Sequence, residues 1–301
     1  MSHFKGILLA GGKGTRLYPV TQVASKQLQP IYNKPMIYYP LTTLLVAGVR
    51  EVLIISSPED IGRFEALLGD GRRWGIQLQY AVQAEPKGIA QALQIGREFV
   101  GNDSVFLMLG DNLIYGRLDF LRAAMAANGA GATVFAYHVH NPQEYGVVEF
   151  GPDGKARSLE EKPKQPKSNW AVPGLYLYGP GAAAEADAVT PSARGELEIT
   201  DLNRRYLQRG QLTVMPMGRG IAWLDTGTPE SLLEASNFVH TLETRQGLFV
   251  GSPEEAAFHM GFLDVAGLAN CIAATPDGPY RAYLQRILDG AHRDLAAGGR
   301  G

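Results

Sequence analysis

Short apolar runs alternate with longer segments of helical spacing through the first half of the chain. The runs that predict buried strands are residues 4–10, 51–56, 76–82 and 104–109. The segments that predict helices are residues 35–47, 58–68 and 88–100. Strands that alternate with helices in this way favour parallel βαβ units, so we predict an α/β fold with a doubly wound, mostly parallel, Rossmann-like sheet.

The pattern becomes richer in strands after residue 130 and mainly helical after residue 227. Strands over 133–139, 146–150 and 174–178, with a turn at residues 152–154, predict a mixed-sheet extension. Thr228 suits a helix N-cap before Pro229, and Ser252 and Glu255 have the spacing of a capping box. We therefore predict an α/β domain over 1–227, in two parts of about 1–130 and 131–227. A helical C-terminal region over 228–292 and a frayed tail over 293–301 complete the chain.

The charge balance and the single cysteine exclude several classes of protein. Lys and Arg number 28 and Asp and Glu number 30, a net charge of −2, which argues against binding to nucleic acid polymers or to anionic membranes. Cys271 alone cannot form an internal disulfide or a cysteine metal site. No apolar run reaches the ~18 residues of a membrane span, and the first residues lack a signal-peptide pattern. We expect a cytoplasmic protein.

A glycine-rich segment, residues 8–19, follows the first predicted strand. Glycines leave backbone N–H groups free to surround phosphate oxygens, and Arg16 adds a planar charged fork. The segment is not a Walker A loop, because Lys13 is followed by Gly14, and Leu17 breaks the dinucleotide-binding pattern. Lys26 lies a few residues downstream and could neutralise further phosphate charge. Taken alone, the segment could also be a simple turn and Lys26 a solvated surface lysine.

The segment 8–19, together with residues 25–28, resembles the N-terminal motif of the sugar-nucleotide pyrophosphorylases. The resemblance to the glucose-1-phosphate thymidylyltransferase family extends over nearly the whole chain. The matching stretches are residues 34–41, 109–112, 144–150, 159–163, 194–201 and 223–228. The resemblance implies a nucleotidyltransferase sheet with a sugar-binding extension. It also implies a reaction of dTTP with glucose 1-phosphate that yields dTDP-glucose and pyrophosphate and serves dTDP-rhamnose and surface polysaccharide synthesis.

The resemblance also assigns the residues of the nucleotide site. They are Leu9, Gly11, Gly14, Thr15, Arg16, Lys26, Gln27, Gln83, Pro86, Gly88 and Asp111. Gln83 fits thymine, because a glutamine amide both donates and accepts hydrogen bonds. Two positions near this site depart from the family pattern: Lys87 replaces an acidic residue, and Gln29 stands where leucine is usual.

The remaining catalytic assignments concern the sugar and the metal. The positions matched to the sugar phosphate are Asn112, Gly146, Glu161, Lys162 and Val172. Asp111 and Asp225 are the expected Mg²⁺ ligands and, with Arg16 and Lys26, the expected catalytic residues. The attacking phosphate oxygen is already anionic, so the reaction requires no nucleophilic side chain. His138 and His140 are interpreted as a packed or solvated pair rather than a metal site.

Members of this family assemble as homotetramers with a second nucleotide site that dTDP-rhamnose occupies as an inhibitor. The residues matched to that site are Leu45, Tyr115, Gly116, Arg219, Ser252, Glu255 and His259. His259 replaces an arginine of most relatives, so we expect weaker and more pH-dependent inhibition in this protein.

Three alternatives remain open. A pyrophosphorylase of the same fold could make UDP-, CDP- or ADP-sugars. Mixed specificity for dTTP and UTP is also open, because uracil and thymine differ only by a methyl group. A metal-dependent glycosyltransferase would require an Asp-x-Asp motif, whereas the sequence reads Asp111-Asn112-Leu113. A non-catalytic regulatory paralogue would be favoured by the loss of Arg16, Lys26, Asp111 or Asp225, and all four are present.

Overall fold

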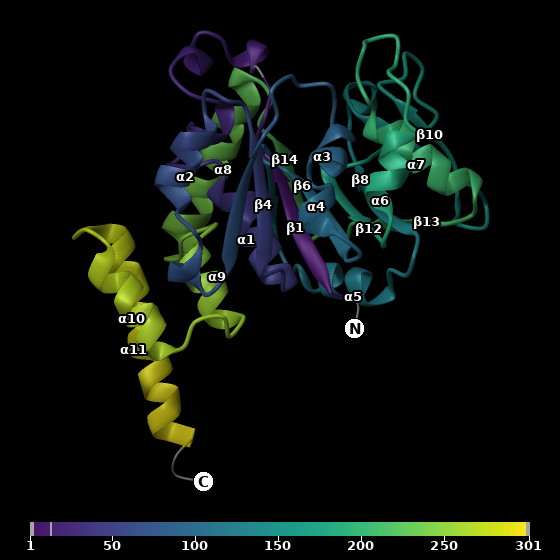
Figure 1. Cartoon of the computed structure of the whole chain (residues 1–301). Coiled ribbons are helices and arrows are strands. Elements are labelled where there is room, and N and C mark those ends of the chain that lie inside the picture. The colour runs from purple at the N-terminus through teal and green to yellow at the C-terminus, as the bar shows by residue number, and fades with distance from the viewer. Residues whose placement is uncertain (1–2, 13, 299–301) are drawn as a thin grey trace.

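A mixed ten-stranded sheet forms the centre of the protein, with helices on both faces (Figure 1). The computed structural model describes residues 3–12 and 14–298. From edge to edge the strands are β10 (Ala156–Glu161), β9 (Gly146–Phe150), β11 (Trp170–Ala171), β8 (Ala132–His138), β12 (Leu175–Tyr178), β6 (Ser104–Leu109), β1 (Phe4–Leu9), β4 (Glu51–Ser56) and β5 (Gln77–Val82). The tenth strand, β13 (Leu212–Pro216), pairs with β8.

The predicted parallel half of the sheet is confirmed. β6, β1, β4 and β5 run parallel, and Gly6 of β1 aligns with Phe106 on one side and Val52 on the other. β12 is antiparallel to both β6 and β8, so it joins this half to the mixed extension in one continuous sheet. Two small ribbons lie outside the sheet: β2 (Pro30–Ile31) with β3 (Lys34–Pro35), and β7 (Asn112–Tyr115) with β14 (Ala222–Asp225).

Alternation of side chains along β1 creates a core on each face of the sheet. Leu8 points into one core and Ile7 into the other, because successive residues of a strand face opposite sides. The first core is covered by α1 (Tyr38–Ala47), α2 (Ile61–Leu68), α5 (Asp119–Ala127) and α9 (Pro253–His259). The second is covered by α3 (Gln91–Ile95), α4 (Arg97–Val100), α6 (Ala182–Asp187) and α7 (Ile199–Gln208). This is the doubly wound arrangement that the sequence predicts.

The predicted helix over 88–100 is wrong in its extent. The segment forms two short helices, α3 and α4, that meet at Gly96. A Cβ atom on Gly96 would lie 2.6 Å from Ile7 Cδ1, so a larger residue there would displace the Ile7 side chain of β1. Gly88 has a φ of +109°, which a right-handed helix does not allow, so the helix begins only at Gln91.

The C-terminal region is helical, as expected. α8 (Pro229–Gln246) begins after Thr228, which forms a full capping box with Ser231. Ser252 caps α9 through its hydroxyl, which accepts from the Glu255 N–H at 3.3 Å, while the Glu255 carboxylate lies 3.8 Å from His259 Nε2.

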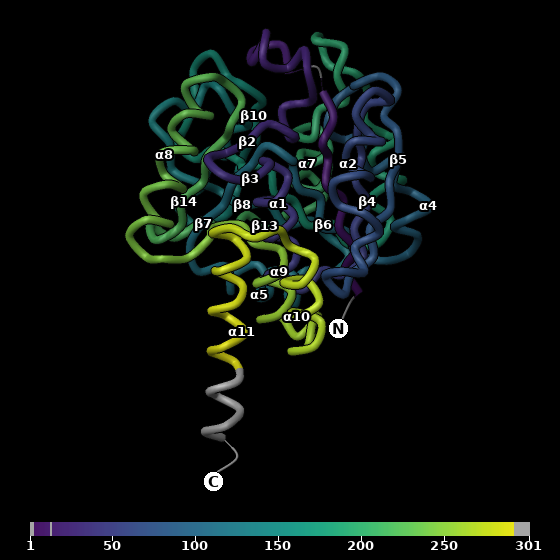
Figure 2. The backbone as a smooth tube through the Cα atoms, turned by 90° about the vertical axis from the view of Figure 1, so that its left-hand side faces the viewer, coloured from purple at the N-terminus to yellow at the C-terminus, as the bar shows by residue number. Residues whose placement is uncertain are grey.

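Helices α10 (Val265–Ala274) and α11 (Pro279–Gly298) pack on each other beyond the sheet (Figure 2). The frayed tail over residues 293–301 stays a prediction, and α11 extends as far as Gly298. Residues 299–301 of that predicted tail lie outside the described residues. Within the described part of the chain, none of the helices combines the length and apolarity that a membrane crossing requires.

A buried ion pair ties α8 to the ribbon β2–β3. Lys34 Nζ donates to Glu243 Oε1 at 2.8 Å, and the two side chains are 5% and 6% exposed. Glu243 also accepts from Asn33 Nδ2 at 2.6 Å and from the Val250 N–H at 2.9 Å. Burial lowers the pKa of Lys34, although Glu243 opposes this shift. The buried ammonium of Lys34 and the buried carboxylate of Glu243 therefore neutralise each other.

We expect Glu243→Gln to lower the free energy of unfolding by about 3–5 kcal/mol, because it leaves the buried Lys34 ammonium without a counter-ion. Urea denaturation followed by circular dichroism measures the loss. The control is Asp277→Asn, which removes the exposed Arg281–Asp277 pair of 2.7 Å and should change nothing measurable. An equal decrease in the free energy of unfolding in the two variants would show that the buried pair contributes no more to stability than the exposed one.

Candidate active site

A cavity of about 270 Å³ lies where β1 and β6 end, between the two halves of the sheet. Twelve of the predicted site residues line it: Leu9, Gly11, Arg16, Lys26, Gln27, Asp111, Asn112, Gly146, Glu161, Lys162, Val172 and Asp225. Residues predicted to bind the nucleotide and residues predicted to bind the sugar phosphate lie far apart in the sequence but line the same cavity. In open α/β sheets, ligands bind at this carboxyl edge of the strands.

Glycines shape the nucleotide side of the cavity. Gly14 has a φ of +55°, and a Cβ atom there would lie 2.7 Å from Thr21 Cγ2. Thr15 begins a short 3₁₀ turn, Thr15–Leu17, that carries Arg16. Lys13, the other charged residue of the segment 8–19, lies outside the described residues.

The predicted nucleotide-binding residues Gln83, Pro86 and Gly88 follow β5. Gln83 and Pro86 line a neighbouring cavity of about 380 Å³. Gln83 points toward the glycine-rich segment, because a Cβ atom on Gly11 would lie 2.4 Å from Gln83 Oε1. Gly88 packs against the backbone of Leu197, whose oxygen would be 2.5 Å from an added Cβ atom.

Gln27 brings an uncompensated polar atom to the cavity. Its side chain is buried, and its Nε2 donates to the Gly11 carbonyl at 3.4 Å. Within residues 3–12 and 14–298, its Oε1 has no hydrogen-bond partner. A buried acceptor without a partner suits a ligand that brings a donor.

Lys26, Asp111 and Asp225 form the charged centre of the cavity. Lys26 Nζ bonds to an Asp111 carboxylate oxygen. Burial opposes the charge on Asp111, but Lys26 and Asn112 outweigh burial and hold its pKa below the ordinary value. Among the described residues, no cation makes such a direct bond to Asp225. Burial and the negative charge of Asp111 raise the pKa of Asp225 to about 6, against the opposing charges of Lys26 and Arg16.

Neighbouring hydrogen bonds fix the two aspartates. Asn112 Nδ2 donates to Asp111 Oδ1 at 2.9 Å, while Asn112 Oδ1 accepts from Trp223 Nε1 at 2.7 Å and from the Gly174 N–H at 2.9 Å. Thr226 Oγ1 donates to the Asp111 carbonyl at 2.9 Å, which ties the strand end of Asp225 to that of Asp111. Asn112, predicted to contact the sugar phosphate, lines the cavity and also orients Asp111.

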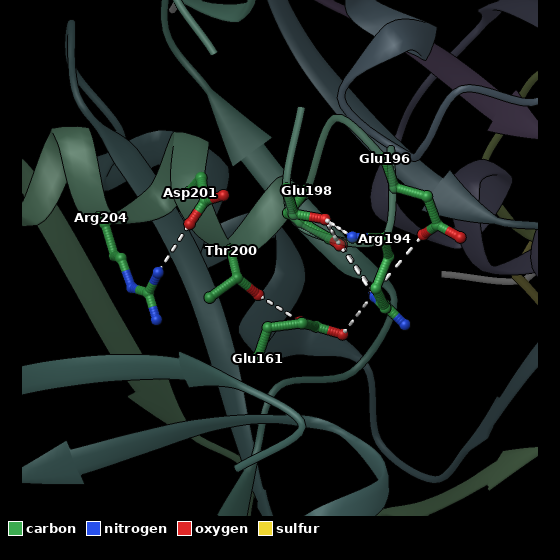
Figure 3. A network of polar contacts seen from close by, with 8 residues as sticks. Glu161, Arg194, Glu196, Glu198, Thr200, Asp201 and Arg204 are labelled. Carbon is green, nitrogen blue, oxygen red and sulfur yellow. Dashed lines mark hydrogen bonds and ion pairs between the residues drawn. The ribbon is translucent and has the colours of Figure 1, made fainter. Parts of the chain in front are cut away.

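The sugar side of the cavity contains a network of charged residues (Figure 3). Glu161 Oε2 accepts from Thr200 Oγ1 at 2.6 Å, and Arg194 lies 3.6 Å from its other oxygen. Gly146 leaves room for the Thr200 hydroxyl and the Glu161 carboxylate, since an added Cβ atom would lie 3.1 Å from Thr200 Oγ1. Lys162 has a φ of +42°, a strained conformation for a non-glycine residue.

Several residues in and beside the cavity escaped the sequence reasoning, and three of them are polar or aromatic side chains that contact predicted site residues: Arg194, Thr200 and Trp223. Thr200 and Trp223 line the cavity, and Arg194 pairs with Glu161 and Glu198. All three lie in stretches already matched to the family, 194–201 and 223–228, so their position in those stretches was the available signal.

Comparison with known proteins identifies the family. The nucleotidyl transferase family model matches residues 5–241. Glucose-1-phosphate thymidylyltransferase of Neisseria meningitidis is 54% identical over 94% of this chain and 99% of the relative. Its namesake from Mycobacterium tuberculosis is 52% identical over 95% of this chain and 99% of the relative. The chain belongs to the glucose-1-phosphate thymidylyltransferase family of nucleotidyl transferases.

Solved structures agree with this membership. A crystal structure described as a thymidylyltransferase of this family from Bacillus anthracis, in complex with sucrose, has a TM-score of 0.73 and 41% identity, over 78% of this chain and 94% of that one. A UDP-glucose pyrophosphorylase bound to UDP-glucose has a TM-score of 0.69 over 80% of this chain and 99% of that one, at 24% identity, and supports the fold alone. The predicted family, fold class and enzyme class are thus confirmed.

The two departures near the nucleotide site are accommodated locally. Lys87 Nζ pairs with Glu85 at 3.0 Å on the surface, while its backbone N–H donates to Gln91 Oε1 at 2.9 Å. Gln29 Nε2 donates to the carbonyls of Val20 and Ala24 at 3.3 and 3.2 Å. Both side chains therefore find partners within the loops that carry them.

The residues of the predicted second site come together only in part. A cavity of about 310 Å³ is lined by Tyr115, Gly116, Ser252, Glu255 and His259. Leu45 does not line it, because this face of α1 packs its side chain into the core. Arg219 also lies outside the lining, in the exposed turn before β14, although its neighbour Gly220 touches Gly116. Glu255 raises the pKa of His259, against the effect of burial.

His138 packs edge-on against Trp170, with ring centroids 5.4 Å apart. Over the residues that the structure describes, no group of three or more His, Cys, Asp or Glu side chains could hold a metal ion. A metal in the active site would therefore depend on Asp111, Asp225 and oxygen atoms from the substrates.

We expect Asp225→Asn to stabilise the protein at pH 8 in EDTA, on the order of 2–3 kcal/mol. The folded state holds a proton on Asp225 up to about pH 6, whereas the unfolded state releases it near pH 4. The wild type therefore loses stability as the pH rises through this window, and the neutral asparagine does not. Urea denaturation from pH 4 to 8 measures the difference, which should vanish at the acid end. A variant less stable than wild type at pH 8 would contradict the buried repulsion.

Proposed function

We propose that the cavity joins the thymidylyl group of dTTP to glucose 1-phosphate, giving dTDP-glucose and pyrophosphate. The observation that carries this proposal is that the nucleotide and sugar residues line one cavity around Lys26, Asp111 and Asp225. Nearly full-length similarity to relatives named for this activity supports it.

The chemistry requires two anions to approach each other. The phosphate oxygen of glucose 1-phosphate attacks the α-phosphorus of dTTP in line with the departing pyrophosphate. Arg16, Lys26 and Lys162 all line the cavity and bring three positive charges to this approach. Positioning and charge neutralisation then supply most of the rate enhancement, as in other phosphoryl-type transfers.

The polar groups on either side bind the two substrates. The acceptor Gln27 Oε1 suits the deoxyribose hydroxyl, and Gln83 suits thymine. Glu161, with Thr200 beside it, accepts hydrogen bonds from the sugar hydroxyls. Lys162 and Arg194 supply charge near the sugar phosphate.

Asp111 and Asp225 fit a Mg²⁺ site, because the two carboxylates are close enough for the charge of Asp111 to raise the pKa of Asp225. Two carboxylates together with substrate phosphates are a sufficient ligand set for Mg²⁺. Bound Mg²⁺ would neutralise the charge that develops on the phosphate oxygens. We further propose that the product feeds dTDP-rhamnose and surface polysaccharide synthesis, and that the protein works in the cytoplasm as a homotetramer. The support for these points is the family resemblance.

The test is pyrophosphate release from a matrix of nucleoside triphosphates and sugar 1-phosphates, with Mg²⁺ and with EDTA. We expect dTTP and glucose 1-phosphate to be the best pair, UTP to follow, and EDTA to abolish turnover. Lys26→Ala should lower kcat by about 10²–10³-fold, because the charge on the reacting phosphates is left uncompensated.

The matched control is Lys87→Ala, which removes an exposed lysine 59% accessible to solvent and should leave kcat unchanged. Turnover of Lys26→Ala near the wild-type value would remove Lys26 from the catalytic residues. A preference for CTP or ATP would assign the protein to another pyrophosphorylase of the fold.

We also propose that dTDP-rhamnose inhibits through the second cavity and that His259 contacts it. Histidine loses its charge near neutral pH, so inhibition should weaken as the pH rises from about 6 to about 8. His259→Arg should bind the inhibitor more tightly and lose this pH dependence. The measurement is the inhibition constant at both pH values. Equal constants and equal pH dependence in the two proteins would show that His259 does not contact the inhibitor.

A further inference from the structure

Gln91, the first residue of α3, receives two hydrogen bonds on one oxygen. The Lys87 backbone N–H donates to Gln91 Oε1 at 2.9 Å, and Gln83 Nε2 donates to the same atom at 2.7 Å. Gln91 is not among the residues that line the two cavities beside the glycine-rich segment. It acts on the site through Gln83.

The backbone N–H of Lys87 fixes the orientation of both side-chain amides. A backbone N–H can only donate, so the Gln91 atom that faces it must be the oxygen. That oxygen accepts from Gln83, so the Gln83 atom facing it must be the nitrogen. The Gln83 oxygen then lies on the opposite side of its carboxamide, toward Gly11, where an added Cβ atom would lie 2.4 Å from it.

Reversal of the Gln83 amide is therefore unfavourable. It would place two amide oxygens against each other, and Gln91 cannot reverse in response without turning its own N–H₂ group toward the Lys87 N–H. Gln83 is only 4% exposed, so water cannot readily compensate a mismatched pair.

We propose that Gln91 is a specificity-determining residue, because it locks the Gln83 carboxamide with its acceptor toward the nucleotide base. The inference rests on the proposed contact of Gln83 with the base. An acceptor at this position selects a base with an N–H at ring position 3, which thymine and uracil carry. Cytosine has an unprotonated nitrogen there and presents an acceptor to an acceptor. The second hydrogen of Gln83 Nε2 remains for the carbonyl oxygen at position 4 of thymine or uracil.

The fixed orientation of the Gln83 carboxamide predicts which bases the site rejects and which it accepts. It discriminates against cytosine but does not distinguish thymine from uracil, whose hydrogen-bonding edges are identical. Any preference for dTTP over UTP must come from contacts with the methyl group or the ribose.

The experiment compares kcat/KM for dTTP and dCTP, with glucose 1-phosphate as the acceptor. Gln91→Leu frees the Gln83 amide to reverse, so the dCTP-to-dTTP ratio should rise about tenfold or more, the usual size of a donor–acceptor mismatch at a buried site. Gln91→Glu retains an acceptor for both donors and should keep the wild-type ratio. Gln91→Ala repeats the loss with a smaller side chain, should the leucine variant fail to fold.

The matched control is Gln94→Leu on the same helix. Gln94 Nε2 donates to the Ala186 carbonyl at 3.1 Å, so this variant loses a hydrogen bond of α3 without touching Gln83. Its ratio should equal that of the wild type. A rise in Gln94→Leu equal to that in Gln91→Leu would reduce the effect to helix destabilisation and overturn the proposal.

Gln83→Ala separates the two levels of the inference. If it changes the ratio but both Gln91→Leu and Gln91→Ala leave it at the wild-type value, the lock is wrong and the base contact stands. If Gln83→Ala changes neither the ratio nor KM for dTTP, the proposed contact of Gln83 with the base is wrong, and the proposed role of Gln91 is wrong with it.

Discussion

Asp111 and Asp225 are held in the same buried cleft, where each carboxylate raises the electrostatic cost of ionising the other, and much of the surrounding structure compensates for this. Lys26 bonds to Asp111, so Asp225 bears most of the repulsion. Asn112 orients the Asp111 carboxylate, and Thr226 ties the strand end of Asp225 to the Asp111 backbone carbonyl. Lys26 and Arg16 offset this repulsion only in part, because the pKa of Asp225 is still raised to about 6. Holding two carboxylates close together in this way costs stability, and active sites often accept such a cost in favour of function.

The strand order explains how these groups meet. Asp111 follows β6 in the parallel half, whereas Asp225 ends β14, which pairs with β7 only after the chain has built the whole mixed extension. The cavity thus has one wall from each half of the sheet. Gly11 and Gln27, predicted to contact the nucleotide, belong to one wall, and Gly146 and Glu161, predicted to contact the sugar phosphate, belong to the other. In the proposed reaction, each wall would bind one substrate and the phosphates would meet between the walls.

Local patterns in the sequence account for the parallel half of the sheet and for the glycine-rich segment. The apolar run over residues 51–56 coincides with β4, and Thr228 caps α8 as its residue type suggests. Features that depend on distant neighbours were out of reach. Gly96, where α3 and α4 meet, packs against Ile7 of β1, and the antiparallel insertion of β12 depends on pairing with β6 and β8.

The candidate site was predictable only because the resemblance supplied long-range information. Asp111 and Asp225, taken singly, look like ordinary turn residues. The role of Arg194 depends on Glu161, and the role of Gln91 depends on the Lys87 backbone and the Gln83 amide together. Such relations between main chain and side chain leave no mark in a pattern of residue types. The burial of Leu45 and the exposure of Arg219 also follow from packing, which motif matching does not describe.

The position of β12 between β6 and β8 has a kinetic consequence. Its backbone hydrogen bonds hold both walls of the cavity in one ladder, so the walls cannot swing apart as separate domains without breaking the centre of the sheet. Such breakage approaches global unfolding in free energy. Admission of substrates and departure of pyrophosphate are therefore left to the connecting segments above the strand ends, where Tyr18 and Val23 are 65% and 75% exposed. Rearrangement of exposed loops is in general faster than the local unfolding that opening of a continuous sheet would require.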